Sequence, residues 1–454
     1  MKTKYYITVL IAIVAAISAS AQEAKKLSLD EAIALSLKNS KDIKLNDAKI
    51  KEATASLCEA RERRLPDLSI TGAYMRLSKP DIDTKLKLGG SSSTSETGGS
   101  SSTSGSGSSS AGLTVNEASY GIANLSIPVF AGLKIQHGIQ AAKYLQKATT
   151  LDAAKDREEV IANTIAAYSN LYKAKAALEI VKENLKQSQN RVADFSNLEK
   201  NGLLAKNDLL KAQLQQSNIE LSLVDAENNW KITYISMNLM LGLPEETELI
   251  PDSESFKTTT DSKNFEEWES LALQNRKDME AMNWRVKAAN AGVKAAKGDY
   301  YPSLALTGGY IAADVPGLLT LTNVMNGGIG VKYSPSSLWK TGSKVAASKA
   351  RLQEAQISRD MMTDGLRLQV AQAYQNYLSN TKKIEVYGKA NEQATENYRI
   401  VNNKYNNNLA TTTDLLEADV AQLQAKLNYA FSKADALVAY KKLLLTAGLL
   451  NENN

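Results

Sequence analysis

The chain carries the same pattern twice, and this internal duplication limits its possible folds more than any other feature. Residues 29–74 align without a gap on residues 265–310, and residues 167–243 align without a gap on residues 373–449. Chance does not preserve two ungapped registers over such lengths. The 454 residues therefore contain two copies of one structural plan.

Two short polar turns mark the same point in the two copies. The first runs from Asn201 to Ala212 and the second from Asn407 to Ala418, with the same spacing of Asn, Asp and Ala. The stretches on both sides of each turn have a helix-favouring composition and lack proline. The first arm alone would be about 100 Å long at the usual rise per residue. We predict two long helical hairpins, over 133–242 and 340–447, with tips near 201–208 and 407–414.

An alternating pattern precedes each hairpin. Leu68, Ile70 and Tyr74 fall on one face of a segment with period two, and the segment that begins at Ser303 repeats this alternation. Such alternation indicates β-strands. The segments before them are rich in Ala, Lys and Glu and end at a proline, which indicates helices. We predict helices over 29–64 and 265–299, and strands over 67–79, 118–129, 303–311 and 327–334.

Three further segments complete the order of the chain. Residues 1–21 combine an early positive region, a short apolar run and small residues before the end, which is the pattern of a secretory signal peptide. Residues 80–117 contain a long tract of Ser, Thr and Gly, so we expect a solvated loop there. Residues 244–264 are expected to link a first repeat over 22–243 to a second repeat over 265–454.

Residue types that catalyse reactions or bind metals are scarce. The chain has one His, His137, and one Cys, Cys58, which leaves no disulfide framework, no Cys-based metal site and no partners for a catalytic His. We interpret His137 as an ordinary surface residue and Cys58 as a small packing residue. The net charge of +5 forms no basic cluster for nucleic acid. We therefore expect no catalytic residues, no cofactor and no bound metal.

The order of elements and the tip turns resemble the TolC family of outer-membrane efflux channels over the whole mature chain. The resemblance implies an α+β membrane protein that is internally duplicated. Four strands per chain would contribute to a trimeric outer-membrane β-barrel of about 12 strands, with the serine-rich loop on the extracellular side. The hairpins would continue it as a long periplasmic α-helical barrel of coiled coils. The most specific motifs are Gly202-Leu203-x4-Asp208-Leu209-Leu210-x-Ala212 and Leu409-x4-Asp414-Leu415-Leu416-x-Ala418.

The small number of strands agrees with this implied assembly. Four strands cannot close a barrel, and a sheet edge that faces lipid leaves backbone groups without hydrogen bonds. Further copies of the chain must therefore complete the barrel. Aromatic side chains near the prolines between strand and helix fit either an interfacial belt or simple packing of the junction. They are Phe130, Tyr300, Tyr301, Tyr333 and Trp339.

Two acidic residues follow the second turn at positions i and i+3. By resemblance, Asp414 and Glu417 line the channel constriction at the periplasmic tip, where three copies of each would repel one another, raise some of their pKa values and attract cations. The alternative is local, with Asp414 as N-cap residue and Glu417 reaching back in a capping box. Asp208 at the equivalent position favours the local interpretation of Asp414, whereas the counterpart of Glu417 is Lys211.

Other tip residues are assigned by resemblance. Tyr405 matches a tyrosine that locks the tip closed by bonding the first turn, here near Asp208, whereas Ala410 stands where the lock has an arginine. Alternatively, Tyr405 is a packed helix residue. The apolar and hinge residues of the tips suggest docking of the helical hairpin of an adaptor, or they staple the turns locally. They are Gly202, Leu203, Leu204 and Leu409.

The resulting hypothesis is an outer-membrane exit duct of a tripartite efflux or type I secretion system in a Gram-negative envelope. By resemblance, it is a homotrimer in outer-membrane lipid, opened by a periplasmic membrane-fusion adaptor and driven through it by an inner-membrane pump, with no nucleic-acid partner. The competing hypothesis is a periplasmic or surface coiled-coil scaffold without a pore. The strand pairs and the serine-rich loop argue against a scaffold, which needs neither.

Overall fold

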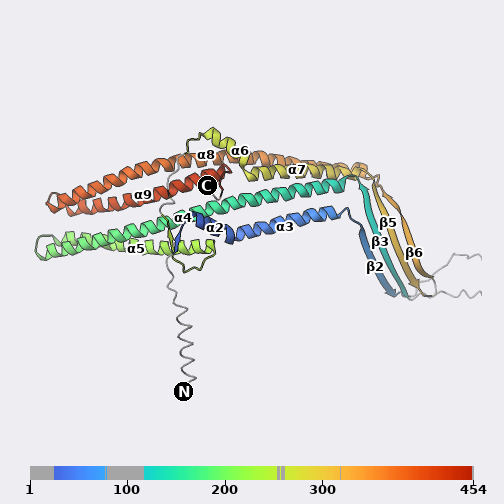
Figure 1. The fold of residues 1–454 in the computed structure, drawn as a ribbon, viewed down its shortest axis with the longest axis horizontal. Coiled ribbons are helices and arrows are strands. Elements are labelled where there is room, and N and C mark those ends of the chain that lie inside the picture. The colour runs from blue at the N-terminus through green and yellow to red at the C-terminus, as the bar shows by residue number, and fades with distance from the viewer. Residues whose placement is uncertain are drawn as a thin grey trace, which may run out of the picture. The chain divides into compact units, whose positions relative to one another are not determined.

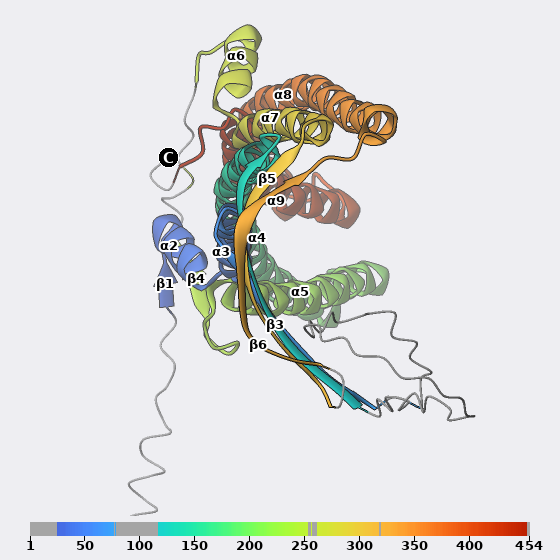
Figure 2. The same cartoon turned by 90° about the vertical axis from the view of Figure 1, so that its right-hand side faces the viewer.

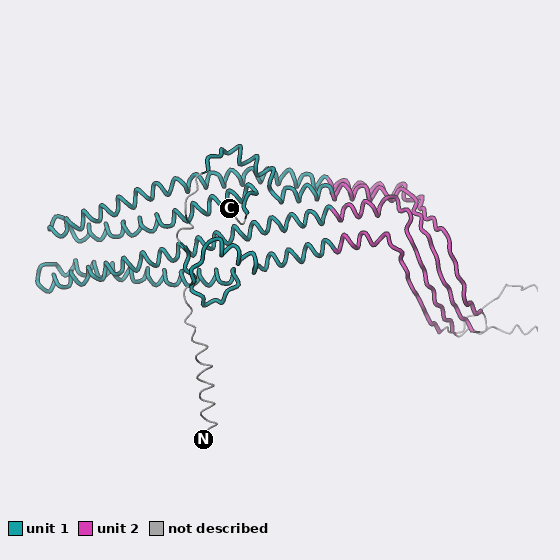
Figure 3. Tube along the Cα trace, viewed as in Figure 1, with its two compact units in different colours: residues 1–54, 144–287, 353–454 teal, residues 55–143, 288–352 magenta. Residues whose placement is uncertain are grey.

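The computed structural model describes residues 25–76, 78, 117–252, 256, 261–316 and 319–451. The predicted signal peptide and nearly all of the predicted serine-rich loop lie outside the described residues. The chain divides into two compact units, which Figure 3 colours separately. Unit 1 comprises residues 1–54, 144–287 and 353–454, and unit 2 comprises residues 55–143 and 288–352.

Both repeats follow the same order of long elements (Figure 1). The first repeat contains β1 (Lys25–Leu27), α2 (Leu29–Asn39), α3 (Lys41–Glu62), β2 (Asp67–Arg76), β3 (Glu117–Ala131), α4 (Lys134–Lys200) and α5 (Lys206–Leu241). The second half contains β4 (Leu249–Pro251), α6 (Phe265–Asn275), α7 (Lys277–Lys297), η2 (Gly298–Tyr300), β5 (Ser303–Val315), β6 (Leu319–Lys332), α8 (Ser337–Asn406) and α9 (Thr412–Thr446). None of the described helices combines the length and the apolar character that a transmembrane helix needs.

The helix predicted at the start of each repeat is in fact two helices. Ser40 separates α2 from α3, because its backbone leaves the helical region at φ −53° and ψ 130°. Its hydroxyl accepts hydrogen bonds from the amides of Asp42 and Ile43 at 3.2 and 3.4 Å. Arg276 occupies the equivalent break between α6 and α7. The composition of these segments favours helix throughout, so it does not reveal a break that depends on a single cap.

Four long strands of unit 2 form one antiparallel sheet in the order β2–β3–β5–β6 (Figure 1), and Figure 2 shows the same sheet from the side. The first pair comes from the first repeat and the second pair from the second repeat. The last two strands are longer than predicted, since β5 extends to Val315 and β6 already begins at Leu319. Leu319 and Leu321 alternate with Thr320 and Thr322 at the start of β6, which favours strand over loop there. The register with β5 shifts between Ile311 and Ala313.

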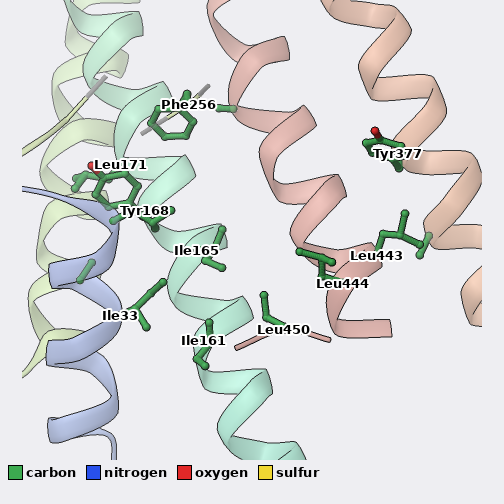
Figure 4. Close-up of a cluster of buried hydrophobic side chains, with 14 of the residues drawn as sticks. Ile33, Ile161, Ile165, Tyr168, Leu171, Phe256, Tyr377, Leu443, Leu444 and Leu450 are labelled. Atoms are coloured by element: carbon green, nitrogen blue, oxygen red, sulfur yellow. The ribbon is translucent and has the colours of Figure 1, made fainter. Parts of the chain in front are cut away.

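The largest buried cluster of unit 1 joins both repeats (Figure 4). Tyr168 on α4 is fully buried and stacks on Phe256 with 5.8 Å between ring centroids. Its hydroxyl donates to the carbonyl of Leu27 in β1 and accepts from the amide of Asp252, both at 2.8 Å. Because β1 pairs in parallel with β4, the predicted linker over 244–264 contains a strand that this tyrosine ties to the helical core.

Two long helices of unit 1 are followed by glycines with positive φ but different surroundings. Gly202 follows α4 with φ 71°, and a Cβ added there would meet nothing within 4 Å. Gly448 follows α9 with φ 67°, and a Cβ added there would lie 2.8 Å from the carbonyl carbon of Asn275. Both positions need the left-handed conformation, but only Gly448 also needs the missing side chain.

Candidate functional site

The two hairpin tips, which lie in unit 1, have the same backbone geometry. The residue in the left-handed conformation is Gly202 after α4 (φ 71°) and Asn408 after α8 (φ 58°). In each tip the next amide, that of Leu203 or Leu409, donates to the carbonyl five residues earlier at 2.8 Å. This Schellman ending satisfies the last carbonyls of the helix. It leaves both leucines in solvent, each 75% exposed.

A small buried cluster supports the tips from α4, α5 and α9. Leu204 packs against this cluster, so its position agrees with the local, turn-stapling alternative. Leu203 and Leu409 do not have this cover, and Gly202 is exposed as well. The docking role therefore stays a prediction. Three of its four residues, Gly202, Leu203 and Leu409, are exposed to solvent. The tip cluster consists of Phe195, Leu209, Ala212 and Leu415.

Asp414 belongs to a capping box, in a different position from the one expected. Thr411 is the N-cap residue of α9, and its hydroxyl accepts from the amide of Asp414 at 3.2 Å. The carboxylate of Asp414 in turn accepts from the Thr411 amide at 2.9 Å. Asp414 is thus the third helical residue, and Glu417 takes no part in the box. The bonds from the backbone amide and then the hydroxyl of Thr411 lower the pKa of the Asp414 carboxyl.

A lysine of the first repeat lies beside this acidic turn. Lys211, the repeat counterpart of Glu417, donates to Oδ1 of Asp208 and to Oγ1 of Thr413, each at 3.3 Å. It therefore connects α5 to the first turn of α9. Within one chain the tip is not uniformly acidic, although Asp414 and Glu417 are both exposed.

Tyr405 and Asp208 have separate partners in the single chain. The ring of Tyr405 stacks on Phe195 with 5.5 Å between centroids, and Asp208 pairs with Lys211. Among the described residues no hydrogen bond joins Tyr405 to Asp208. In one chain Tyr405 is therefore a packed helix residue, as the alternative interpretation predicted. The lock between Tyr405 and the first turn stays a prediction for the assembled protein.

A buried ion pair near the tips was not predicted. Nη1 of Arg191 on α4 donates to Oδ2 of Asp419 on α9 at 2.8 Å. Nη2 of Arg191 donates to the hydroxyl of Tyr398 on α8 at 3.0 Å, and the amide of Asn184 donates to Asp419 at 3.2 Å. The Arg191 and Asp419 side chains are only 8% and 1% exposed. The pair therefore joins three long helices from both repeats.

The physical chemistry of this pair makes it a strong local constraint. Burial lowers the pKa of the Arg191 guanidinium, but the hydrogen bond and charge of Asp419 outweigh burial and the net pKa is raised. Removing one partner costs about 3–5 kcal/mol, because the other charge stays buried alone. A comparison of the two repeats in the sequence already indicates this ion pair. The repeat counterparts of Arg191 and Asp419 are the uncharged Asn397 and Gln213, so two opposite charges each occur in one repeat only.

The sheet of unit 2 has two chemically different faces. The strand register places Leu68 opposite Leu125, and Leu306 opposite both Ile127 and Ile329. Because side chains alternate along a strand, these pairs define one apolar face. Its residues are Leu68, Ile70, Tyr74, Leu125, Ile127, Leu304, Leu306, Tyr310, Met325, Ile329 and Val331. The opposite face carries the polar residues Ser69, Thr71, Asn124, Ser126, Thr307 and Asn326 together with small residues and a few larger apolar ones, such as Ile122 and Ile311.

Among the residues that the structure describes, nothing covers the apolar face. Ile70, Met325 and Ile329 are 79%, 80% and 73% exposed. Removing one such side chain from water stabilises a protein by about 2 kcal/mol, so a continuous face of this size calls for an apolar environment. An apolar outer face opposite a polar inner face is the arrangement of strands in outer-membrane barrels.

Comparisons with known proteins identify the family. The family model described as outer membrane efflux protein matches residues 32–243 and 268–449. The chain belongs to the outer membrane efflux protein family. The two matched segments begin and end at positions that correspond in the repeat register, so the family match contains the duplication as well. A comparison with curated protein sequences found no match.

Several solved channels share the fold of this outer membrane efflux protein. VceC of Vibrio cholerae is 18% identical, with 92% of this chain and 96% of that chain covered and a TM-score of 0.73. CmeC of Campylobacter jejuni is 18% identical, with 94% and 87% covered and a TM-score of 0.74. The outer-membrane channel OprN is 16% identical, with 94% and 91% covered and a TM-score of 0.76.

These findings confirm the predicted resemblance, fold class, location and general function. The protein is a duplicated α+β outer-membrane efflux channel whose helical hairpins extend into the periplasm. The four strands of one chain form an open sheet and not a closed barrel. The family is one of channels and not of enzymes.

Two single residues were also interpreted from the sequence. Cys58 is exposed, so its predicted packing role was wrong. Nδ1 of His137 lies 3.2 Å from Oε1 of Gln140.

Proposed function

We propose that three copies of this outer membrane efflux protein form one passive exit duct. The observation that carries the proposal is the uncovered apolar face of an open four-stranded sheet. In the part of the chain that the structure describes, the edge strands β2 and β6 have one neighbour each. Unpaired edges are not tolerated against lipid. Three copies supply about 12 strands, an ordinary size for an outer-membrane barrel. The apolar face then contacts lipid and the polar face lines water.

The helical hairpins carry the duct across the periplasm to its partners. A periplasmic membrane-fusion adaptor docks at the tips, where Leu203 and Leu409 offer exposed apolar side chains and Gly202 provides a hinge. An inner-membrane pump acts through that adaptor and supplies the energy of export. The same architecture serves a tripartite efflux system or a type I secretion system, so the proposal covers small-molecule and protein cargo.

The tip of the assembled duct is the proposed constriction. Three copies of Asp414 and Glu417 meet near one axis and attract cations. Their mutual repulsion raises carboxyl pKa values, which opposes the lowering that the Thr411 bonds produce in a single chain. In the closed state Tyr405 reaches the first turn near Asp208. Ala410 makes no contribution to this lock.

The test is to extract the protein from outer membranes in detergent and to reconstitute it in planar bilayers. We expect a species of trimer mass that survives SDS without heating and falls to monomer on heating, together with single-channel conductance. A soluble monomer without conductance would refute the proposal and favour the coiled-coil scaffold. For docking, a photo-crosslinker at position 203 or 409 should capture the adaptor, whereas one at the buried position 415 should not.

A further inference from the structure

A basic pocket lies in unit 2, where the strands of the sheet meet the long helices. Its volume is about 540 Å³, which is enough for a small organic molecule. Four lysines and one aspartate line it, so three positive charges remain in excess at neutral pH. They are Lys134, Lys332, Lys340, Lys344 and Asp299.

The single carboxylate of the basic pocket binds two of the lysines and leaves the other two unpaired. Nζ of Lys134 on α4 donates to Oδ1 of Asp299 at 2.9 Å, and Lys344 on α8 donates to Oδ2 of the same residue. Lys332 and Lys340 form no ion pair with any residue that the structure describes. Because like charges repel one another, four lysines around one pocket favour a bound anion over an empty site.

Backbone packing fixes the position of this carboxylate. A Cβ added to Gly298 would lie 2.6 Å from the carbonyl oxygen of Gly132. Because Gly298 has no side chain, η2 packs directly against the turn before α4, and Asp299 reaches Lys134. Charges that are already held in place need little reordering when a ligand binds.

Hydroxyl groups complete the lining and can donate hydrogen bonds to an anion. Thr341, which lies between Lys340 and Lys344 on α8, is only 5% exposed. The Oγ atom of Ser337 is buried and has no hydrogen-bond partner among the described residues, so one donor remains free for a ligand. The hydroxyl groups belong to Ser303, Ser334, Ser336, Ser337 and Thr341.

The strand register shows on which face of the sheet the pocket lies. Ser303 of β5 pairs with Ala131 of β3 and with Lys332 of β6, and all three residues line the pocket. The next residue, Leu304, pairs with Val331 on the apolar face. Because successive side chains of a strand point to opposite faces, the pocket lies on the polar face, which lines water in the proposed trimer.

Another pocket of unit 2, beside the start of α4, has a different lining. Its volume is about 250 Å³, and Arg64 is the one charged residue among the described residues that line it. Most of the others are apolar, among them Val129, Phe130 and Leu133. The cluster of lysines is therefore a property of the basic pocket and not of the junction between strands and helices in general.

We propose that the basic pocket binds small anionic solutes, which carry carboxylate, sulfonate or phosphate groups, inside the duct. Three copies of the chain triple the excess of positive charge around the water-filled channel and raise the local concentration of anions. The proposed constriction follows the last turn of α8 and attracts cations, so the two ends of this helix favour opposite charges. The place of the pocket in the duct rests on the proposed trimer, but the pocket itself is complete within one chain.

Equilibrium binding of a fluorescent anion tests the pocket. The probe is pyranine, a pyrene with three sulfonate groups, and its anisotropy is followed during titration with the purified full-length protein in uncharged detergent. The pocket variant carries Lys332→Gln with Lys340→Gln. The matched control variant carries Lys143→Gln with Lys349→Gln, which removes two exposed lysines of α4 and α8 that do not line the pocket.

We expect the dissociation constant of pyranine to rise roughly tenfold in the pocket variant, which corresponds to about 1.4 kcal/mol, and to stay near the wild-type value in the control variant. Lys332→Arg with Lys340→Arg keeps both charges and should retain binding. Asp299→Asn should tighten binding, because Lys134 and Lys344 then lose the carboxylate that competes with the probe.

Two binding results would refute the pocket. One is a wild-type protein without saturable binding of pyranine, and the other is an equal loss of affinity in the pocket and control variants. Each variant is first checked for trimer migration without heating, so that a folding defect is not taken for a binding defect.

Single-channel recordings in planar bilayers test the place of the pocket in the duct. Pyranine should reduce the current of the wild-type channel more than that of the pocket variant, and bound probe without any effect on current would overturn this placement. The two proposals fail separately. A protein that never conducts fails as a duct, whereas a conducting channel that does not bind pyranine refutes the pocket alone.

Discussion

Replacing Asp419 by Asn is the sharpest perturbation of the tip that the structure offers. The change keeps the shape of the side chain and removes its charge, so the guanidinium of Arg191 stays buried without a counter-charge. Arg191 is only 8% exposed and its hydrogen bond to Asp419 is 2.8 Å long. Breaking a buried pair in this way costs about 3–5 kcal/mol. At the lower value the local opening constant of the tip rises roughly 100-fold.

Hydrogen exchange of the assembled channel measures this opening. Amides of α4 and α9 near residues 191 and 419 should exchange roughly 100-fold faster in Asp419→Asn, since protected amides exchange through local opening. The matched control is Asp435→Asn, which breaks the more exposed Lys173–Asp435 pair between the same helices. Exposed pairs contribute about 0–1 kcal/mol, so exchange there should change little.

A second variant separates charge from packing. Replacing Arg191 and Asp419 together by Met and Leu removes both charges and keeps most of the volume, so protection should return to near the wild-type level or exceed it. Two results would show that the ion pair does not hold the tip closed. One is unchanged hydrogen exchange in Asp419→Asn, and the other is a double variant that loses as much protection as the single variant.

Three further predictions concern stability and conduction. Gly448→Ala should destabilise the protein more than Gly202→Ala, because a Cβ at position 448 also clashes with the backbone of Asn275. At Gly202 only the positive φ opposes the change, at about 1–2 kcal/mol. Thermal unfolding followed by circular dichroism compares the two variants, and equal losses of stability would contradict the clash at position 448. Burial raises the pKa of the Glu158 carboxyl, so the wild-type protein loses stability as the pH rises from the pKa of this group in the unfolded chain to its pKa in the folded chain. Glu158→Gln should therefore be more stable than the wild type at about pH 8 and equally stable at about pH 4. The double change Asp414→Ala with Glu417→Ala should reduce cation preference and cation block in planar bilayers, whereas unchanged selectivity would reject the acidic constriction.

The long elements of this fold could be predicted from the sequence because their signals are repeated. Proline-free stretches and the paired tip turns indicated the helical hairpins, and alternation at Leu68 and Ile70 indicated strands. The break at Ser40 could not be predicted from composition, since a single hydroxyl caps the new helix there. The early start of β6 was missed because Asn323 and Asn326 suggest a loop before residue 327, whereas the strand already pairs with β5 from Leu319.

The site was predictable only in its outline. The tip turns locate Asp414 and Leu409, but the role of Asp414 depends on Thr411, three positions earlier, whose hydroxyl takes the N-cap position. The ion pair of Arg191 and Asp419 joins residues 228 positions apart. No local pattern predicts such a contact. Only the departure of both positions from the repeat indicates it.

The open sheet has a consequence for how this protein matures. A lone copy in the periplasm would present a water-repelling surface and two borders of unpaired backbone groups, which are templates for aggregation. Completed folding in water is therefore not a stable resting point before insertion. Strand closure, insertion and the meeting of sister copies have to be coupled events, so the yield of channels depends on how many immature copies meet at the bilayer. Variants that slow this step should accumulate as degraded precursors and not as folded monomers.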